Sequence, residues 1–276
     1  MALFFINLLY VKTLAAMIII THIDTACILL DINGYRIMTD PTLDRSGKLY
    51  HHGFGALSTK TSEPAVQNTD LSKIDLILLS HHQHKDNFDE KGQEFAASAP
   101  LILSTKAAAK TLKNIIGLDN WESYSIDTPK LTNFKITATP AQHHPSWVPE
   151  FISGKVIGFI IEADEFVDGP IYISGDTVYF NGIDEVAKRY RVDIAFFHLG
   201  SVQFRYLTGF GQYTMSARGL LKSVQVMQPN MVIPIHYKGW THFKQSESTL
   251  RLTVLKYPIL KEKTLFLTPG EPTLIR

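Results

Sequence analysis

Residues 80–89, which read S-H-H-Q-H-K-D-N-F-D, decide the fold and the chemistry of this chain. An apolar run rich in Leu and Ile, residues 74–79, directly precedes this stretch and predicts a buried strand. His81, His82, His84 and Asp86 then follow in quick succession. Imidazole nitrogens and carboxylate oxygens suit zinc, iron or manganese. The alternative is a solvated loop rich in histidine, but packing alone gives no reason for these side chains at the end of a strand.

Three other short apolar runs end close to a side chain that could bind a metal. Residues 134–140 lead to His143, residues 171–174 lead to Asp176, and residues 232–235 lead to His236. Open α/β sheets place their sites beyond the carboxyl ends of their strands. We therefore expect these side chains to converge on the stretch at 80–89 and to form one metal site.

The remaining elements complete an α/β pattern. Apolar runs predict further strands over residues 17–21, 26–32, 35–39, 101–104, 121–126, 156–163, 193–197 and 263–267. Capping residues and helical spacing predict helices over residues 89–99, 105–116, 184–190 and 214–227. The loop over residues 42–70 is long, which favours either a wall of the substrate cleft or an ordered surface loop. Both β-rich halves carry candidate ligands, so we expect a two-sheet sandwich with helices on its outer faces and the site between the halves.

The composition restricts the class of protein. Hydrophobic residues make up 45% of the 276 residues, which is ample for a large core. A formal net charge of +1 argues against general binding of nucleic acid, which usually needs a basic surplus. Cys27 is the single cysteine, so the fold needs no disulfide and no oxidising compartment. We expect a cytoplasmic protein.

Residues 1–16 are strongly apolar but match no single targeting pattern. They lack the basic start of a secretory signal, and Asn7, Lys12 and Thr13 interrupt the run that a membrane helix would need. We interpret them as an extension, an anchor or an over-called start, and this choice leaves membrane association open. Residues 17–276 are predicted to form a single domain.

The pieces H-x-H-x-D, P-A-Q-H-H at 140–144, S-G-D-T at 174–177 and P-I-H-Y at 234–237 together resemble the metallo-β-lactamase-fold hydrolases. They are most similar to the branch that includes ascorbate-phosphate lactonases and the phospholipase D that cleaves N-acyl phosphatidylethanolamines. The resemblance implies a four-layer αβ/βα sandwich of two mixed β-sheets. It also implies one or two divalent metal ions, with zinc favoured and manganese or iron as alternatives.

The family pattern also suggests which residues bind which metal. His82, His84 and His143 would hold one ion, Asp86 and His236 would hold the other, and Asp176 would bridge them. Two departures from the pattern matter. The family's Asp-His pair is Asp86-Asn87 here, and an Asn carbonyl is a poor zinc ligand, so the second ion could be weakly held, absent or a harder ion. The doublet at 81–82 leaves His81 as a rival to His82, which the spacing to Asp86 slightly favours.

These residues predict a metal-dependent hydrolase of a small ester, lactone or phosphodiester. A bound metal would lower the pKa of a water to about 7, and Asp86 would orient that water or accept its proton. His198, Tyr237 and Trp240 are candidates for contact with the substrate, as is His242, although both histidines could be ordinary structural residues. The alternatives are a metal-binding pseudo-enzyme, which the Asn at 87 keeps open, and a nuclease of the same fold. The expected partner is a small-molecule substrate, and self-association into a homo-oligomer is left open.

Overall fold

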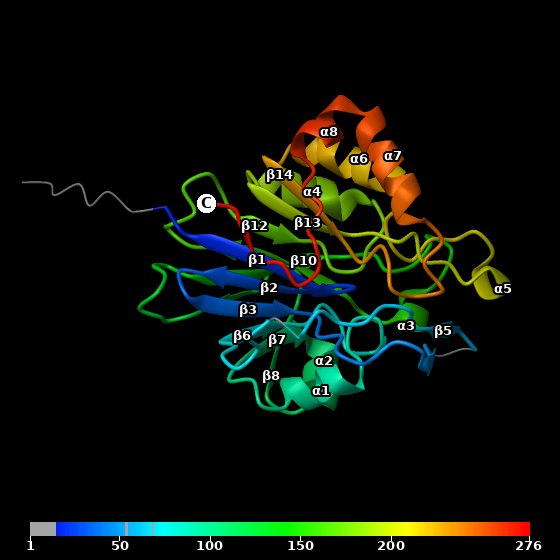
Figure 1. Ribbon diagram of the computed structural model, residues 1–276, viewed down its shortest axis with the longest axis horizontal. Helices are drawn as coiled ribbons and strands as arrows, with labels where there is room; N and C mark the ends of the chain where they lie inside the picture. Colours follow the sequence, from blue (N-terminus) through cyan, green and yellow to red (C-terminus); the bar gives the residue numbers. More distant parts are fainter. Residues whose placement is uncertain (1–14, 53–54, 68) are drawn as a thin grey trace, which may run out of the picture.

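Two β-sheets lie face to face in the centre of the protein, and helices cover the outer face of each (Figure 1). The computed structural model describes residues 15–52, 55–67 and 69–276. In Figure 1, the helices within residues 90–111 lie below the sheets, and the helices within residues 181–189 and 217–263 lie above them. This arrangement is the four-layer αβ/βα sandwich predicted from the sequence.

The first sheet has seven strands in the order β15-β1-β2-β3-β6-β7-β8. Neighbours from β15 to β3 are antiparallel, and neighbours from β3 to β8 are parallel. The strands are β1 (Ile18–Asp24), β2 (Cys27–Ile32), β3 (Tyr35–Thr39), β6 (Leu76–Leu78), β7 (Ile102–Thr105), β8 (Ile115–Leu118) and β15 (Thr273–Leu274). The parallel part of the sheet directs the carboxyl ends of β3, β6 and β7 toward one edge, where the stretch at 80–89 begins.

The second sheet has six strands in the order β14-β13-β12-β11-β10-β9. Here β12, β13 and β14 are parallel, and the other neighbours are antiparallel. The strands are β9 (Ser123–Ser125), β10 (Lys135–Pro140), β11 (Ile157–Glu162), β12 (Ile171–Ile173), β13 (Ile194–His198) and β14 (Met231–Ile235). Between β3 and β6, the chain adds a small hairpin of β4 (Leu49–His51) and β5 (Leu57–Thr59).

Helices cover both outer faces. The short helices α1 (Glu90–Ala96) and α2 (Lys106–Thr111) belong to the N-terminal half, and α4 (Asn181–Arg189), α6 (Ala217–Met227), α7 (Glu247–Lys256) and α8 (Pro258–Lys263) belong to the C-terminal half. One-turn helices α3 (Glu150–Ser153) and α5 (Arg205–Thr208) lie within loops. Both sheets are covered on both sides, so their central strands are apolar almost throughout, as in β13 and β14.

The main core fills the space between the two sheets. Ile20, Leu30 and Ile37 of the first sheet and Phe159 and Phe196 of the second belong to one cluster of buried side chains. At about 25 cal/mol per Å² of buried apolar surface, this face-to-face packing is the main source of stability for the sandwich. It also holds the two sets of strand ends, and the side chains that follow them, at a fixed separation.

The C-terminal part of the chain differs from the sequence-based prediction. Residues 263–267, predicted as a strand, contribute only an isolated bridge between Val232 and Thr264, and β15 is the strand that pairs with β1 instead. Helices α7 and α8 were not predicted, because Leu252 and Leu255 of α7 are exposed and blur its apolar face. The helix predicted over residues 105–116 ends earlier, and its last two residues belong to β8 (Ile115–Leu118).

The predicted extension over residues 1–16 lies outside the described residues apart from its last two. Its role, and the single domain expected from residue 17 onward, stay predictions. Across the described part of the chain, no helix combines the length and the apolar character that crossing a membrane requires.

Candidate metal centre

The candidate ligands follow the carboxyl ends of four strands, as the sequence predicts. His81, His84 and Asp86 follow β6, His143 follows β10, Asp176 follows β12, and His236 follows β14. Because β6 belongs to the first sheet and the other three strands belong to the second, the site lies where the two sheets meet. The side chains form two groups, His81 with His84 and His143, and Asp86 with Asp176 and His236.

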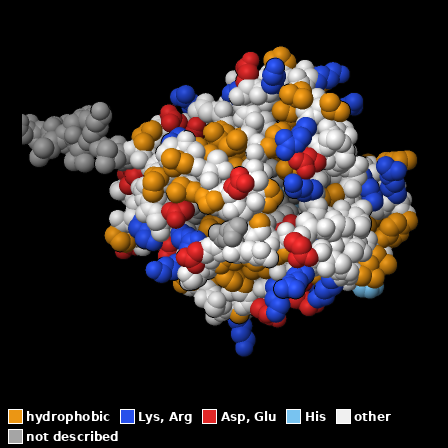
Figure 2. Space-filling model, viewed as in Figure 1, with side chains coloured by type: hydrophobic (Ala, Val, Ile, Leu, Met, Phe, Trp, Pro, Cys, Tyr) orange, Lys and Arg blue, Asp and Glu red, His pale blue; other side chains and the backbone are white. Residues whose placement is uncertain are grey.

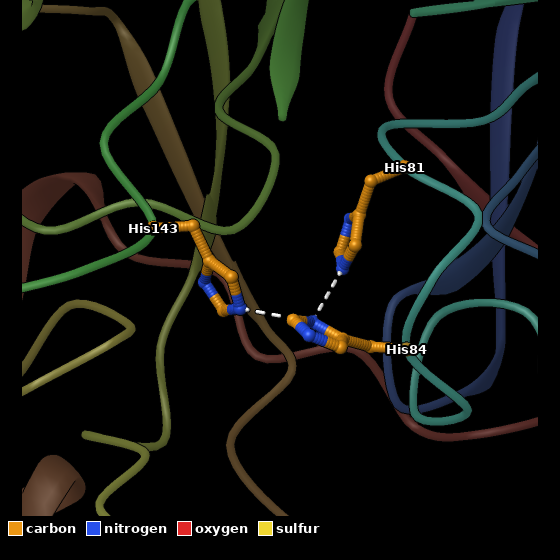
Figure 3. Close-up of side chains that lie close together, drawn as sticks. All are labelled: His81, His84 and His143. Carbon is orange, nitrogen blue, oxygen red and sulfur yellow. Dashed lines mark hydrogen bonds between the residues drawn. The ribbon is translucent and has the colours of Figure 1, made fainter. Parts of the chain in front are cut away.

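In the first group, three imidazoles point toward one another (Figure 3). His84 Nδ1 lies 3.1 Å from His81 Nε2 and 3.1 Å from His143 Nε2. Two ligand atoms of a tetrahedral zinc ion, each about 2.0–2.1 Å from the metal, are about 3.3 Å apart. The spacing of the three nitrogens is therefore close to that of ligands around one ion.

Neighbouring groups fix the orientation of these rings. His143 Nδ1 lies 2.9 Å from the carbonyl oxygen of Tyr213, which can only accept a hydrogen bond. Nδ1 of His143 is therefore the protonated nitrogen, and in the neutral ring Nε2 keeps its lone pair facing the group. His81 Nδ1 lies 2.9 Å from Ser80 Oγ, which holds that ring in the same manner. Metal-binding histidines typically have such a partner on the nitrogen that faces away from the metal.

Burial and mutual repulsion keep this group of histidines neutral. Burial lowers the pKa of His81 and of His143 well below the ordinary value, and the neighbouring imidazoles lower it further. Burial also lowers the pKa of His84 to about 4. Neutral imidazole is the form that binds a metal, so at neutral pH these three side chains are in the state that binding requires.

The second group has a different chemistry. His236 Nε2 lies 3.4 Å from Asp86 Oδ2 and 3.7 Å from Asp176 Oδ1. His236 has a positive φ of 55°, which is costly for a residue with a side chain, and its Nδ1 lies 3.3 Å from the Leu199 carbonyl oxygen. The turn before Asp176 is equally constrained, because a Cβ at Gly175 would lie 2.4 Å from the Ile157 carbonyl oxygen.

The two carboxylates of the second group have opposite pKa shifts. Burial opposes the charge on Asp86, but the imidazoles of His242 and His236 outweigh this effect and hold its pKa well below the ordinary value. Burial raises the pKa of Asp176 to about 6. For His236, burial is outweighed by Asp176 and Asp86, which raise its pKa to about 9. In the absence of another cation, the His236 proton therefore balances part of the buried negative charge.

Several buried polar atoms of the second group have no hydrogen-bond partner among the described residues, and they show whether a cation fits this site. Asp86 Oδ1, both carboxylate oxygens of Asp176 and His236 Nε2 are buried and have no hydrogen-bond partner among the described residues. Leaving such atoms unsatisfied costs about 1–3 kcal/mol each, and more for charged groups. Carboxylate oxygen and imidazole nitrogen are all suitable donors to a divalent metal. The residues present therefore fit a metal ion.

The preference for His82 over His81 is not matched by the structure. His82 Nε2 lies 3.0 Å from Thr111 Oγ1 on α2, and the side chain is half-buried and separate from both groups. The two neighbouring side chains point in different directions. The His81 ring points toward His84 and His143 (Figure 3), whereas the His82 ring points toward α2.

The residues predicted to contact substrate lie away from the open pocket. His198 is fully buried, with Nε2 3.3 Å from Asp40 Oδ2. Tyr237 packs edge-on against Phe266, with ring centroids 6.1 Å apart. Trp240 is buried and donates from Nε1 to Thr25 Oγ1 at 3.1 Å. None of the three lines the pocket beside the candidate ligands, and their contact with substrate stays a prediction.

The pocket beside the ligands is mostly apolar. Its polar end is formed by candidate ligands and two further histidines, and its walls come from several loops. The lining residues are His52, Ala56, His84, Asp86, His143, Ile152, Ser153, Val202, Phe204, Leu207, Tyr213 and His242. The predicted loop over residues 42–70 does form part of the wall, through His52 and Ala56.

Two histidines of this pocket surround Asp86. His242 Nε2 lies 2.9 Å from Asp86 Oδ2, and His52 Nδ1 lies 3.7 Å from Asp86 Oδ1. Sequence reasoning left His242 as an open candidate and did not assign His52 individually, because neither follows a strand in a recognisable motif. The length of the loop at 42–70 was the only signal for His52.

A buried lysine anchors the hairpin that carries His52. Lys60 is fully buried, and its Nζ lies 2.9 Å from Asp24 Oδ2 and 3.1 Å from Asp89 Oδ2. Asp89 also accepts from the backbone N–H of Gly92 at 2.8 Å and so caps α1. Removing one partner of such a buried network costs about 3–5 kcal/mol. These contacts tie the β4–β5 hairpin to both the first strand and the start of α1, next to the ligands.

The four-layer sandwich, with His and Asp ligands at the strand ends between its sheets, defines a metal-dependent hydrolase of the metallo-β-lactamase superfamily. Residues 35–237 match the profile described as the Beta-lactamase superfamily domain, and the chain belongs to this family. A protein of Caldivirga maquilingensis named UPF0173 metal-dependent hydrolase is 30% identical over 184 residues, which cover 66% of this chain and 72% of that protein. A second protein of that name, from Pyrococcus horikoshii, is 25% identical over 77% of this chain and 87% of its own length.

Solved structures agree with this fold. A possible metal-dependent hydrolase from Veillonella parvula has a TM-score of 0.78 at 18% identity, covering 94% of this chain and all of that one. An isothiocyanate hydrolase from Delia radicum gut bacteria has a TM-score of 0.75 at 20% identity, covering 92% of this chain and 98% of that one. At these identities the likeness concerns the fold.

Proposed function

We propose that the protein hydrolyses a small, uncharged ester or lactone with the help of divalent metal, zinc being the ion that its nitrogen-rich first group suits best. The observation that carries this proposal is the pocket itself. Candidate ligands His84, His143 and Asp86 form its polar end, while Ile152, Val202, Phe204 and Leu207 are among its apolar walls. A substrate that enters along these walls meets the ligands at the point where hydrolysis would take place.

When bound, the metal would polarise a substrate oxygen and acidify water. The protein's own residues then have separate tasks. Asp86 is ionised at neutral pH, because its pKa is held well below the ordinary value, and it can orient a water molecule by accepting a hydrogen bond. Burial lowers the pKa of His52 to about 3, so this imidazole stays neutral beside Asp86 and can help to position a polar group of the substrate by hydrogen bonding. The apolar walls exclude bulk water from the reacting groups.

The lining favours an uncharged substrate over a phosphodiester. No Lys or Arg is among the described residues that line the pocket. Phosphate recognition usually uses arginine or lysine. In the adjoining groove, Lys244 and Arg205 are already engaged, since Lys244 Nζ donates to Thr241 O and Arg205 Nε donates to Gln203 Oε1.

Exposed apolar side chains next to the pocket-lining residues of α3 and α5 also favour an uncharged substrate. Tyr206 is 64% exposed and Phe210 is 77% exposed, on and just after α5, and Phe151 of α3 is 77% exposed. Figure 2 shows hydrophobic side chains gathered at the end of the molecule that carries α5. Such a rim fits a substrate with an apolar group. It is compatible with a lactonase-like substrate and with an acyl-bearing one, the two kinds represented in the branch that the sequence motifs resemble.

Turnover of a substrate panel tests this proposal. The panel contains a p-nitrophenyl ester, an aliphatic lactone, an alkyl isothiocyanate and bis(p-nitrophenyl) phosphate, each assayed with zinc, with manganese and after chelation. We expect metal-dependent hydrolysis of the ester or lactone, and loss of it in His81→Ala. The isothiocyanate is included because a protein of similar fold hydrolyses one. Preferential hydrolysis of the phosphodiester would favour the nuclease alternative, and metal binding without any turnover would favour the pseudo-enzyme.

The composition of the chain also bears on its cellular setting. We propose a cytoplasmic location, supported by the single cysteine, Cys27, which is buried and unpaired. The proposed partner is a small molecule, and the near-neutral charge supports the absence of a nucleic-acid partner.

A further inference from the structure

We infer that His242 is a metal ligand of the second group, alongside Asp86, Asp176 and His236. This inference rests on the proposed metal-dependent function, and it concerns a residue that lies six positions after His236 in the loop following β14. His242 Nε2 lies 2.9 Å from Asp86 Oδ2, while His236 Nε2 lies 3.4 Å from the same oxygen. The two imidazoles therefore approach one carboxylate oxygen together.

The separations match those of ligands around one ion. Ligand atoms about 2.0–2.1 Å from a tetrahedral metal are about 3.3 Å from one another, and the two distances above lie on either side of this value. Asp86, Asp176 and His236 supply only three donors from this group. A fourth donor completes a four-coordinate site, and His242 is the histidine that lies nearest to Asp86.

The location of His242 gives it access to the open side of the group. His242 and Asp86 both line the pocket, whereas His236 is fully buried and does not. A ligand on the pocket side can help to hold the ion while the substrate approaches it. Asn87 is the rival for this role, because its amide is buried and has no hydrogen-bond partner among the described residues. It does not line the pocket, however, and an amide oxygen is a poorer ligand for zinc or cobalt than an imidazole nitrogen.

The His242 ring is held firmly in this position. It stacks on Phe204 with ring centroids 5.4 Å apart and an interplanar angle of 13°, and Phe243 meets it edge-on at 4.8 Å. Trp240 lies 5.7 Å away on the same loop. The ring is buried, and its Nδ1 has no hydrogen-bond partner among the described residues, so these aromatic contacts set the orientation of the ring. Aromatic packing on several sides thus prepares Nε2 for an ion beside Asp86.

Metal content measured on the full-length protein tests the inference. Each variant is stripped with a chelator, reloaded with cobalt(II) alone and measured by mass spectrometry. We expect two equivalents in the wild type, in Asn87→Ala and in the control His82→Ala, whose side chain faces α2. His242→Ala is expected to lose one equivalent. Two equivalents in His242→Ala, or loss of one in Asn87→Ala alone, would overturn the assignment of His242.

A second variant separates direct ligation from mere positioning of Asp86. In His242→Cys, a thiolate replaces the imidazole, and cobalt(II) bound to it should give a near-ultraviolet thiolate-to-metal absorption band. The wild type, whose Cys27 is buried away from the site, is expected to lack this band. A band in His242→Cys supports ligation, and its absence rejects it. A wild type that binds a single equivalent also rejects the inference while leaving the hydrolase proposal standing, whereas a wild type that binds none contradicts the hydrolase proposal itself.

Discussion

The two groups of candidate ligands are close neighbours, yet they would attract a metal in different ways. His81, His84 and His143 are neutral imidazoles that carry no formal charge in their binding state. The second group contains two buried carboxylates, and the proton on His236 offsets part of their charge. The first group would therefore attract a metal through the geometry of its nitrogen atoms, and the second group through its buried negative charge.

This difference has a consequence for folding. Three neutral imidazoles can be buried at modest cost because they hydrogen bond to one another and to the backbone. Two buried carboxylates repel each other and lose hydration, so the fold tolerates them only with a cation nearby. We expect the second group to depend more strongly on metal for its stability, and the first group to depend more strongly on exact side-chain placement.

The largest effect should come from His84→Ala in the first group. Nδ1 of His84 lies 3.1 Å from the Nε2 atoms of both other histidines. Its loss therefore removes the central ligand of the three and leaves only two. We expect hydrolysis to fall by at least about a hundredfold and one metal equivalent to be lost. Steady-state kinetics and mass spectrometry measure the two effects. Full activity in His84→Ala would mean that the second group alone carries the chemistry.

Removal of metal should also lower the thermal stability of the protein. Binding to the folded state alone stabilises a protein by about 4 kcal/mol at a thousandfold excess of ligand over its dissociation constant. We therefore expect the chelated protein to unfold at a lower temperature than the zinc-loaded protein. In Asp176→Asn, which removes one buried carboxylate, the chelated form should be at least as stable as the chelated wild type. Calorimetry measures both differences, and a chelated Asp176→Asn that unfolds earlier than the chelated wild type would contradict the role of buried charge.

The stability of the chelated protein should fall as pH rises from about 6.5 to about 9. His236 has a pKa of about 9 in the folded state, against an ordinary value of 6.5, so folding is favoured while this ring is protonated. This contribution is complete below pH 6.5 and is lost as pH rises through 9. It amounts to about 3 kcal/mol, because the pKa rises by about 2.5 at 1.36 kcal/mol per pKa unit. Denaturant unfolding at several pH values measures the slope, which should be absent from His236→Gln.

Much of the fold was predictable because its strands are simple in sequence. The runs that become β6, β10, β12 and β14 are short and apolar, and each leads within a few residues to a polar side chain. Strand ends in open sheets collect such side chains, so the convergence of His143, Asp176 and His236 followed from position alone. Helices α7 and α8 were missed because they are held by contacts with α6 rather than by a clear apolar stripe of their own.

The surroundings of the site were less predictable. His52 and His242 lie 190 positions apart, and only the folding of two loops brings both to Asp86. The buried Lys60 that anchors the hairpin of His52 has no sequence signature either, since lysine is normally exposed. Contacts made by loops depend on the whole packing of the chain, whereas contacts made at strand ends depend on local pattern and topology.

The smallest effect is expected at the pair of neighbouring histidines, His81 and His82. His82 contacts Thr111 on α2 and is half-buried, so His82→Ala should change stability by only about 0.5 kcal/mol and should leave metal content and turnover unchanged. His81→Ala, one residue away, should lose one metal equivalent. The paired measurement compares two neighbouring histidines that the motif alone could not separate. If His82→Ala lost the metal and His81→Ala kept it, the ligand would be His82 and not His81. The first group of ligands would then need to be reassigned.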